Sequence, residues 1–169
     1  RGTSLLELAF LAVPPGLFSC VTVVSQYDRA LALAKAYGFD AIENRTPELG
    51  VSRTIFLGTQ VMLDCDAILY MVADQPLLRQ DSVRAVAERW TREPDCIVGA
   101  AHNGKRGNPC IFPKKLFPEL LALTGDTGGS RVIRQHEDLL RLVEIPPEEL
   151  YDCDTKRALD ALKASTGAS

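Results

Sequence analysis

The sequence contains only two histidines, and none of its five cysteines is spaced as a Cys-x-x-Cys pair. A structural zinc site takes about four His or Cys ligands at short, characteristic spacings, so this composition argues against one. The cysteines are odd in number and most stand in apolar runs, which is typical of buried, reduced thiols in a cytoplasmic protein. We therefore expect a cytoplasmic chain whose cysteines are not paired in disulfides.

Long hydrophobic runs and an excess of basic residues are also missing. No apolar run approaches the ~20 residues that span a bilayer, and no basic start is followed by an apolar segment of signal-peptide type. The 19 Lys and Arg residues are outnumbered by 22 Asp and Glu residues, which gives a formal net charge of −3. Nucleic-acid-binding proteins are usually basic, so neither a nucleic acid nor a membrane is expected as a partner.

Strand-like and helix-like segments alternate along most of the 169 residues, a length that suits one domain. The expected strands span residues 18–24, 39–43, 67–73, 96–101, 109–112 and 139–145. The expected helices span residues 4–13, 27–37, 52–63, 82–90, 114–123, 130–136 and 155–164. Strands separated by helices need crossover connections, which predicts a mainly parallel sheet covered on both faces. We assign residues 1–164 to a single α/β domain and residues 165–169 to a tail.

The apolar segment 67–73 ends on a carboxylate, Asp74, and Pro76 follows two residues later. Proline cannot continue a strand ladder and restricts Gln75 to extended geometry, so the strand should end here. Ligands bind beyond the carboxyl ends of parallel strands, and Mg²⁺ is typically held by one or two carboxylates plus substrate phosphates. Asp74 is therefore a candidate Mg²⁺ ligand, although a turn alone could explain an aspartate at this position.

A second source of carboxylates is the pair Asp152 and Asp154, which flank Cys153. In extended geometry both side chains point to the same side of the chain, so either could meet Asp74. The structural alternative is that Asp154 caps the helix expected from residue 155.

Three loops could contact an anionic ligand, and each could equally be a solvated turn. Residues 48–53 lead into an expected helix with Arg53 beside its N-terminus, an arrangement that favours an anion. Residues 104–109 form a basic segment flanked by glycines, and residues 125–131 form a glycine-rich turn. None of them matches the GxxxxGK[ST] phosphate loop or the GxGxxG fingerprint, and no serine stands on a GxSxG elbow.

Five short motifs in a fixed order resemble the MobA-like nucleotidyltransferases, and most closely the molybdenum cofactor cytidylyltransferases. They are Leu49-Gly50-Val51-Ser52, Ala73-Asp74-Gln75-Pro76-Leu77, Gly107-Asn108-Pro109, Leu123-Thr124-Gly125-Asp126-Thr127-Gly128 and Asp152-Cys153-Asp154-Thr155. The resemblance runs from about residue 4 to residue 162. It implies a Rossmann-like three-layer nucleotidyltransferase fold. It also implies an enzyme that transfers CMP from CTP to molybdopterin with release of pyrophosphate.

The resemblance assigns a role to each motif. Asp74 would be the main Mg²⁺ ligand and Asp154 the second catalytic carboxylate, with Asp152 as the alternative ligand. The nucleotide would be bound by Gly50, Ser52, Arg53 and Asp74. The acceptor would be bound by Gln75, Pro76, Gly107, Asn108, Pro109, Gly125 and Asp126.

The sequence departs from the family pattern in two places. The family begins with a strand and a glycine-rich loop of LAAG type that carries an Arg and a Lys, and residues 1–6 align just after that loop. We expect this strand and loop to lie ahead of Arg1, because a sheet without its central strand would leave backbone groups unpaired. In addition, Asn108 stands where a histidine is common in the cytidylyltransferase branch.

Three other functions stay open. One is a guanylyltransferase of the same cofactor, although the DQP string favours CTP over GTP. Another is a nucleotidyltransferase of a different phosphorylated small molecule. The last is a non-catalytic accessory protein that docks on a molybdoenzyme.

Overall fold

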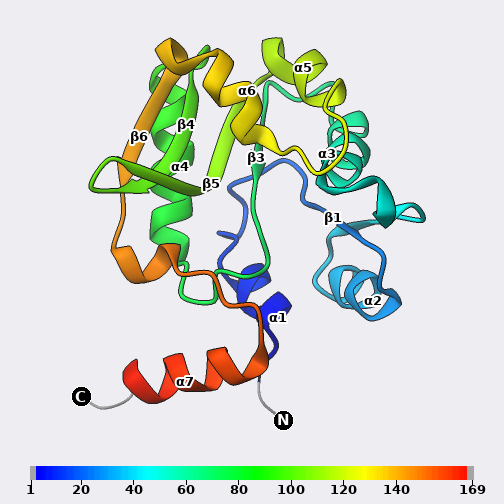
Figure 1. Ribbon diagram of the computed structural model, residues 1–169, viewed down its shortest axis with the longest axis vertical. Helices are drawn as coiled ribbons and strands as arrows, with labels where there is room; N and C mark the ends of the chain where they lie inside the picture. Colours follow the sequence, from blue (N-terminus) through cyan, green and yellow to red (C-terminus); the bar gives the residue numbers. More distant parts are fainter. Residues whose placement is uncertain (1–2, 167–169) are drawn as a thin grey trace.

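The computed structural model describes residues 3–166, which form seven α-helices and six β-strands (Figure 1). The strands are β1 (Thr22–Ser25), β2 (Asp40–Glu43), β3 (Ala67–Tyr70), β4 (Ile97–His102), β5 (Lys105–Pro113) and β6 (Leu140–Glu144). The helices are α1 (Leu5–Leu11), α2 (Asp28–Ala36), α3 (Val51–Gln60), α4 (Gln80–Arg92), α5 (Phe117–Leu121), α6 (Gly129–Gln135) and α7 (Lys156–Thr166). The predicted alternation of strands and helices is confirmed. The tail predicted at 165–169 lies mostly outside the described residues.

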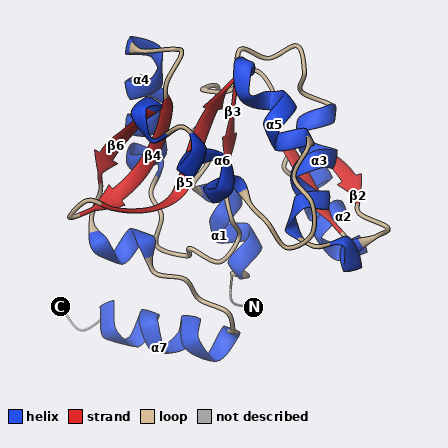
Figure 2. Cartoon of the chain, turned by 45° about the horizontal axis from the view of Figure 1, so that its top comes forward, coloured by secondary structure: helices blue, strands red, loops and turns tan. Residues whose placement is uncertain are grey.

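The strands form two sheets. β1 and β2 pair in parallel, and a second sheet has the order β3-β5-β4-β6. β5 runs antiparallel to both of its neighbours, whereas β4 and β6 pair in parallel (Figure 2). The prediction of an α/β fold is confirmed, and the four-stranded sheet is mixed because β5 runs opposite to β3, β4 and β6.

The segment 104–109 differs from the expectation of a loop. Asn103 and Gly104 form the turn, with φ angles of 50° and 76°, and β5 begins at Lys105. Two consecutive residues with positive φ match the twist of a tight hairpin. Glu144 holds this turn, because its carboxylate accepts hydrogen bonds from the backbone N–H groups of Asn103 (3.0 Å) and Gly104 (3.2 Å). The predicted acceptor residues 107–109 therefore belong to a strand.

Helices cover both faces of the four-stranded sheet. One buried cluster joins the end of α1, at its C-cap residue, to α4, β4 and β5 through residues that include Ala12, Val83, Val98 and Ile111. The other joins β3, β4, β5, α5 and α6 through residues that include Ile68, Ile97, Phe112, Phe117 and Val132. Neighbouring strand residues such as Ile97 and Val98 fall in opposite clusters, as the alternation of side chains along a strand requires. The domain therefore has the three layers that were expected.

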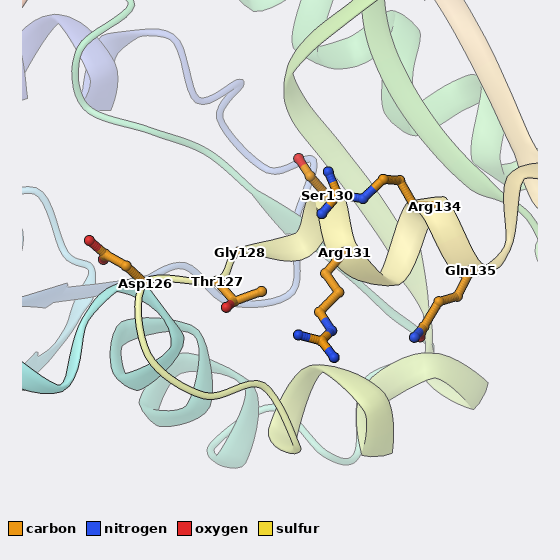
Figure 3. Close-up of a pocket in the computed structure, with 7 residues that line it drawn as sticks. All are labelled: Asp126, Thr127, Gly128, Ser130, Arg131, Arg134 and Gln135. Carbon is orange, nitrogen blue, oxygen red and sulfur yellow. The ribbon is translucent and has the colours of Figure 1, made fainter.

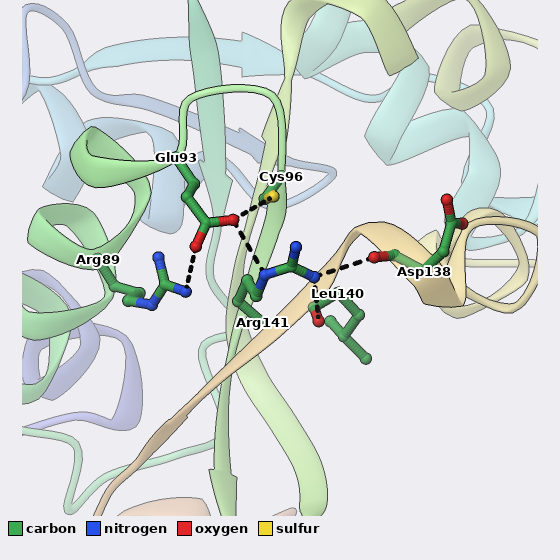
Figure 4. Close-up of polar contacts among 6 residues, drawn as sticks. All are labelled: Arg89, Glu93, Cys96, Asp138, Leu140 and Arg141. Carbon is green, nitrogen blue, oxygen red and sulfur yellow. Dashed lines mark hydrogen bonds and ion pairs between the residues drawn. The ribbon is translucent and has the colours of Figure 1, made fainter.

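An ionic network ties the end of α4 to β6 (Figure 4). The Glu93 carboxylate accepts hydrogen bonds from Arg89 (2.8 Å), from Arg141 (3.0 Å) and from the Cys96 thiol (3.1 Å). The hydrogen bond from Arg89, with those from Cys96 and Arg141, lowers the pKa of Glu93 to about 2. Because Arg141 also donates to the backbone carbonyl of Asp138 at 2.9 Å, the network fixes the start of β6.

The cysteines follow the expectation in part. All five thiols are free, and Cys96, Cys110 and Cys153 are buried, but Cys20 is exposed and Cys65 is half-buried. Within residues 3–166, no helix combines the length and the hydropathy that a membrane span needs.

Candidate functional site

Asp74 lies in the irregular segment that follows β3, beyond the carboxyl end of the strand. Its side chain is partly buried, and its Oδ1 atom finds no hydrogen-bond partner within the described part of the chain. Burial raises the pKa of the Asp74 carboxyl, and the carboxylate of Asp152 and, more weakly, that of Asp154 raise it further. The structure therefore brings the three predicted carboxylates into one neighbourhood, with Asp152 exerting the larger effect.

A backbone hydrogen bond joins the two carboxylate-bearing segments. The N–H of Cys153 donates to the carbonyl of Asp74 at 2.6 Å, so Asp152 and Asp154 flank the residue that contacts Asp74. The hydroxyl of Thr155 accepts a hydrogen bond from the N–H of Ala158 at 3.1 Å and caps α7. Asp154 is therefore not the cap of this helix, which leaves its carboxylate available for another role.

The donor set suits a hard cation that keeps part of its coordination shell for substrate. No three His, Cys, Asp or Glu side chains converge into a metal cage among residues 3–166. An unpartnered carboxylate oxygen beside a second carboxylate is nevertheless what Mg²⁺ needs when phosphates supply further ligands. The residues present therefore fit a divalent cation that binds together with a phosphorylated substrate.

Two loops that were predicted to serve different substrates meet in the structure. Gly50 has a φ of 87°, and a Cβ atom built there would lie 2.5 Å from the carbonyl oxygen of Gly125. The N–H of Ser52 donates to that oxygen at 3.2 Å, and the N–H of Val51 donates to the carboxylate of Asp126 at 3.1 Å. The N-terminus of α3 therefore already holds an anion, which is the side chain of Asp126.

A hollow of about 300 Å³ opens at the carboxyl ends of β1 and β2. Its lining includes Ser25, Tyr27, Asn44, Gly50, Thr54 and Asp126. Asn44 is buried: its amide donates to the hydroxyl of Thr54 at 3.4 Å, and its side-chain oxygen accepts from the N–H of Thr46 at 3.0 Å. Asn44 and Tyr27 were not predicted as site residues from the sequence. Both stand shortly after an expected strand, and that position could have identified them.

A larger hollow of about 610 Å³ lies along the start of α6 (Figure 3). It is lined by Asp126, Thr127, Gly128, Ser130, Arg131, Arg134 and Gln135. Arg131 and Arg134 are exposed and form no ion pair with the described residues. Figure 3 shows the side chain of Arg134 extending toward Ser130, whereas Arg131 projects to another side of the helix. The hollow therefore offers two unpaired cations.

A third arginine connects this hollow to β5. The guanidinium of Arg106 donates to the hydroxyl of Ser130 at 2.6 Å, which links the start of β5 to the start of α6. Gly99 leaves room for it, because a Cβ atom there would lie 3.0 Å from the Cδ atom of Arg106. The sequence analysis did not single out Arg134, and it could not place Arg106 individually, since neither position follows from a local pattern.

The other predicted site residues are less accessible to a ligand. The guanidinium of Arg53 lies 5.2 Å from the ring centroid of Phe56, and Arg53 lines neither hollow. Gln75 and Pro76 are buried, and the amide of Gln75 donates to the carbonyl of Glu149 at 3.4 Å. Asn108 is half-buried and Pro109 is buried, and a Cβ atom on Gly107 would lie 2.8 Å from a methyl group of Leu150. Their substrate contacts stay predictions.

Solved structures share this fold at low sequence identity. The synthase of 4-diphosphocytidyl-2C-methyl-D-erythritol from Anaerococcus prevotii matches with a TM-score of 0.77 and 14% identity, over 98% of this chain and 87% of its own. A nucleotidyl transferase from Methanothermobacter matches with a TM-score of 0.75 and 20% identity, over 98% and 81%. Rv0371c from Mycobacterium tuberculosis, in complex with manganese, matches with a TM-score of 0.69 and 19% identity, over 98% and 88%. At these identities the likeness establishes the fold alone.

Comparison with curated protein sequences gives no match. The model of the family described as the MobA-like NTP transferase domain, however, matches residues 1–139, which is most of the chain. The resemblance to the MobA-like nucleotidyltransferases is therefore confirmed over the four motifs that lie within these residues, and the protein belongs to the MobA-like NTP transferase family of nucleotidyltransferases.

Proposed function

We propose that the protein is a cytidylyltransferase that transfers CMP from CTP to the terminal phosphate of molybdopterin and releases pyrophosphate. The observation that carries the proposal is the partly buried Asp74 carboxylate, which has an unpartnered oxygen and faces Asp152 and Asp154 at the end of β3. The order of the five motifs supports the molybdopterin acceptor. The cytidyl group in the name of the Anaerococcus relative supports CTP.

The metal of this reaction is Mg²⁺, held by Asp74 together with Asp154 or Asp152. Bound beside the phosphates, it would neutralise the charge that develops on the departing pyrophosphate. The manganese complex of the Mycobacterium relative supports a divalent cation in such a fold. The protein's own task is alignment of acceptor and nucleotide, since phosphoryl-type transfer needs little covalent chemistry from side chains.

The hollow beside Asn44 takes the nucleoside, and the hollow beside α6 takes the phosphate of the acceptor. The first lies at the ends of two parallel strands, where nucleotides bind in open α/β sheets. The second is lined by the unpaired Arg131 and Arg134. A planar guanidinium group can donate two parallel hydrogen bonds to two oxygens of one phosphate. Asp126 lines both hollows and Asp74 lines neither, so the proposal requires the phosphates of the bound substrates to extend from the hollows to the carboxylate of Asp74.

The phosphate loop expected ahead of Arg1 has a place in this fold. β1 pairs only with β2, and β3 pairs only with β5, so each has one edge without a strand partner among the described residues. A parallel strand between these edges would join the two sheets into one and satisfy their backbone groups. Its carboxyl end would deliver a glycine-rich loop to the side of the sheet that holds Asp74. Residues 1–164 together with this strand would make the single domain.

The proposed location and partner of the protein follow from the chemistry of its product. A cytoplasmic enzyme that makes a labile dinucleotide cofactor can hand it directly to a molybdoenzyme, which we propose as a transient partner. Neither a membrane nor a nucleic acid has a role in this reaction.

The test is pyrophosphate release by the full-length protein, with Mg²⁺ and molybdopterin, from CTP and from GTP in separate reactions. We expect release from CTP, lost in the Asp74→Asn variant. Release from GTP alone would instead make the protein a guanylyltransferase of the same cofactor. No release with either nucleotide, from a chain shown by mass spectrometry to carry the phosphate loop, would overturn the proposal. It would leave another phosphorylated acceptor or an accessory role.

A further inference from the structure

Glu149 is a buried carboxylate that the proposed reaction does not use. It stands in the short 3-10 helix Pro147–Leu150 and is 1% exposed. Its carboxylate accepts a hydrogen bond from the hydroxyl of Ser82 and lies 3.6 Å from Arg79. Burying a charge is costly unless it is paired, and Arg79 is itself largely exposed, so the pairing is incomplete. Such a residue needs an explanation beyond general stability.

The contacts of Glu149 lie along one boundary between two segments, residues 74–82 and 147–153, which we call the seam. At one end of the seam, the N–H of Cys153 donates to the carbonyl of Asp74. In its middle, the amide of the buried Gln75 donates to the backbone carbonyl of Glu149. At its other end, Ser82 and Arg79 contact the Glu149 carboxylate. Glu149 therefore takes part in three of these four contacts, with its carboxylate toward Ser82 and Arg79 and with its backbone carbonyl toward Gln75.

The seam has to resist a specific force. Asp74 and Asp152 stand on its two segments, and Asp154 follows directly after the second. The hydrogen bond from the N–H of Cys153 to the carbonyl of Asp74 brings these carboxylate-bearing residues together, so their like charges repel one another. Without an anchor, repulsion would move the two segments apart and widen the gap between the carboxylates. Of the four contacts, the one between Glu149 and Ser82 is made by two buried side chains.

We propose that Glu149 is a positioning residue that holds Asp74 and the Asp152–Asp154 pair at the separation a divalent cation requires. This inference rests on the proposed function, because it assigns a task toward the same metal. The side chain of Glu149 touches neither the metal nor the substrates; it acts through Ser82 and Arg79. Removing a residue that orients metal ligands without contacting the metal typically lowers the metal affinity by about 10–100-fold.

A competing explanation assigns Glu149 to the stability of α4 alone. Arg79, the N-cap residue of this helix, makes no side-chain capping hydrogen bond, and Glu149 supplies a negative charge near the first turn. If that were its whole role, its removal would lower the free energy of unfolding and leave the metal affinity of the folded protein unchanged. The two explanations therefore differ in one measurable quantity.

The experiment measures Mn²⁺ binding by the full-length protein, from the electron paramagnetic resonance signal of free Mn²⁺, well below the unfolding temperature of every variant. Glu149→Ala and Ser82→Ala should each raise the dissociation constant about tenfold. Glu149→Gln, which can still accept from Ser82, should restore most of the affinity. The control is Glu119→Gln, which removes another carboxylate contact, the 2.8 Å pair with His136, away from the seam.

Asp74→Asn separates the two proposals. If Mn²⁺ binding to the wild-type protein does not depend on Asp74, the metal site itself is wrong and the inference falls with it. If binding depends on Asp74 but is unchanged in folded Glu149→Ala and Ser82→Ala, the inference alone is overturned and Glu149 serves only α4. Should Glu149→Ala fail to fold, Ser82→Ala and Glu149→Gln decide the question by the same comparison.

Discussion

The carboxylate of Asp126 accepts a hydrogen bond from the backbone N–H of Val51, although 75 positions separate the two residues. The first turn of α3 has no cap of its own, since Gly50 occupies the N-cap position. The first N–H groups of a helix lack partners within it and carry a partial positive charge. Asp126 therefore completes α3 from a distant loop, and it does so where the two hollows meet.

Asp126→Ala should lower the free energy of unfolding by about 1 kcal/mol, the usual cost of losing a helix cap. Urea unfolding of the two proteins measures this difference. Asp95→Ala is the matched control, because Asp95 is exposed and has no hydrogen bond or ion pair within residues 3–166. Equal losses in the two variants would mean that Asp126 does not cap α3.

Gly50→Ala should destabilise the protein more than Gly16→Ala. Both glycines have positive φ angles, 87° and 73°, so both substitutions strain the backbone by about 1–3 kcal/mol. Only at Gly50 does the new Cβ atom meet another backbone, that of Gly125, whereas nothing lies within 4 Å at Gly16. The extra loss, again measured by urea unfolding, should come with weaker CTP binding. Identical losses in the free energy of unfolding would show that the loops of Gly50 and Gly125 can move apart without a cost in free energy.

The sequence carried enough information for most of the fold. The alternation of apolar strands and amphipathic helices is local, so it predicted the three layers and the parallel pairs. The position of Asp74 beyond the carboxyl end of β3 was also predictable, although the strand ends at Tyr70, earlier than Pro76 suggested. The hairpin at Asn103 and Gly104 was missed, since a basic, glycine-flanked segment resembles a loop until its partner strand is known.

Most parts of the site that the sequence did not predict depend on long-range contacts. Arg53 was expected beside an anion, but the ring of Phe56, one turn away, attracts its guanidinium group. The anion at α3 turned out to be Asp126. Arg106 lies beside the hollow at α6 because it contacts Ser130, 24 positions away. The contacts of Asp126 and Arg106 join distant segments, so the local spacing of residues does not indicate them.

Asp74→Asn should increase stability while abolishing activity. Burial and the Asp152 carboxylate raise the pKa of Asp74, which means that its charged form is disfavoured in the folded state. At neutral pH the neutral amide removes that penalty, so the free energy of unfolding should rise. Turnover should fall by at least about a hundredfold, because a metal site is worth several kcal/mol of charge stabilisation. A variant that loses both stability and activity would show that the Asp74 carboxylate does not destabilise the folded state, which contradicts this explanation.

Glu93→Gln should destabilise the protein at pH 6 and much less at pH 3. The pKa of Glu93 is lowered to about 2, whereas a glutamate in an unfolded chain has a pKa of about 4.3. A lowered pKa contributes stability that is complete above the unfolded value and is lost as the pH falls toward the folded one. Urea unfolding at the two pH values measures the difference between the wild type and the variant. Glu88→Gln, an exposed neighbour on α4, is the control and should show no such pH dependence.

Arg131→Gln and Arg134→Gln should raise the KM for the acceptor and leave CTP binding unchanged. Both side chains line the hollow at α6 without an ion pair among the described residues, and neither lines the hollow beside Asn44. Losing a guanidinium contact to a phosphate costs about 1.5–3 kcal/mol, the strength of a hydrogen bond to a charged group, so a rise of roughly tenfold or more is expected. Steady-state kinetics with the acceptor varied at saturating CTP measures the change in KM.

Arg29→Gln, on the exposed face of α2, controls for the loss of one positive charge. If the arginine variants weakened CTP binding instead, the hollow at α6 would belong to the nucleotide, and the acceptor would have to approach from the side of β5.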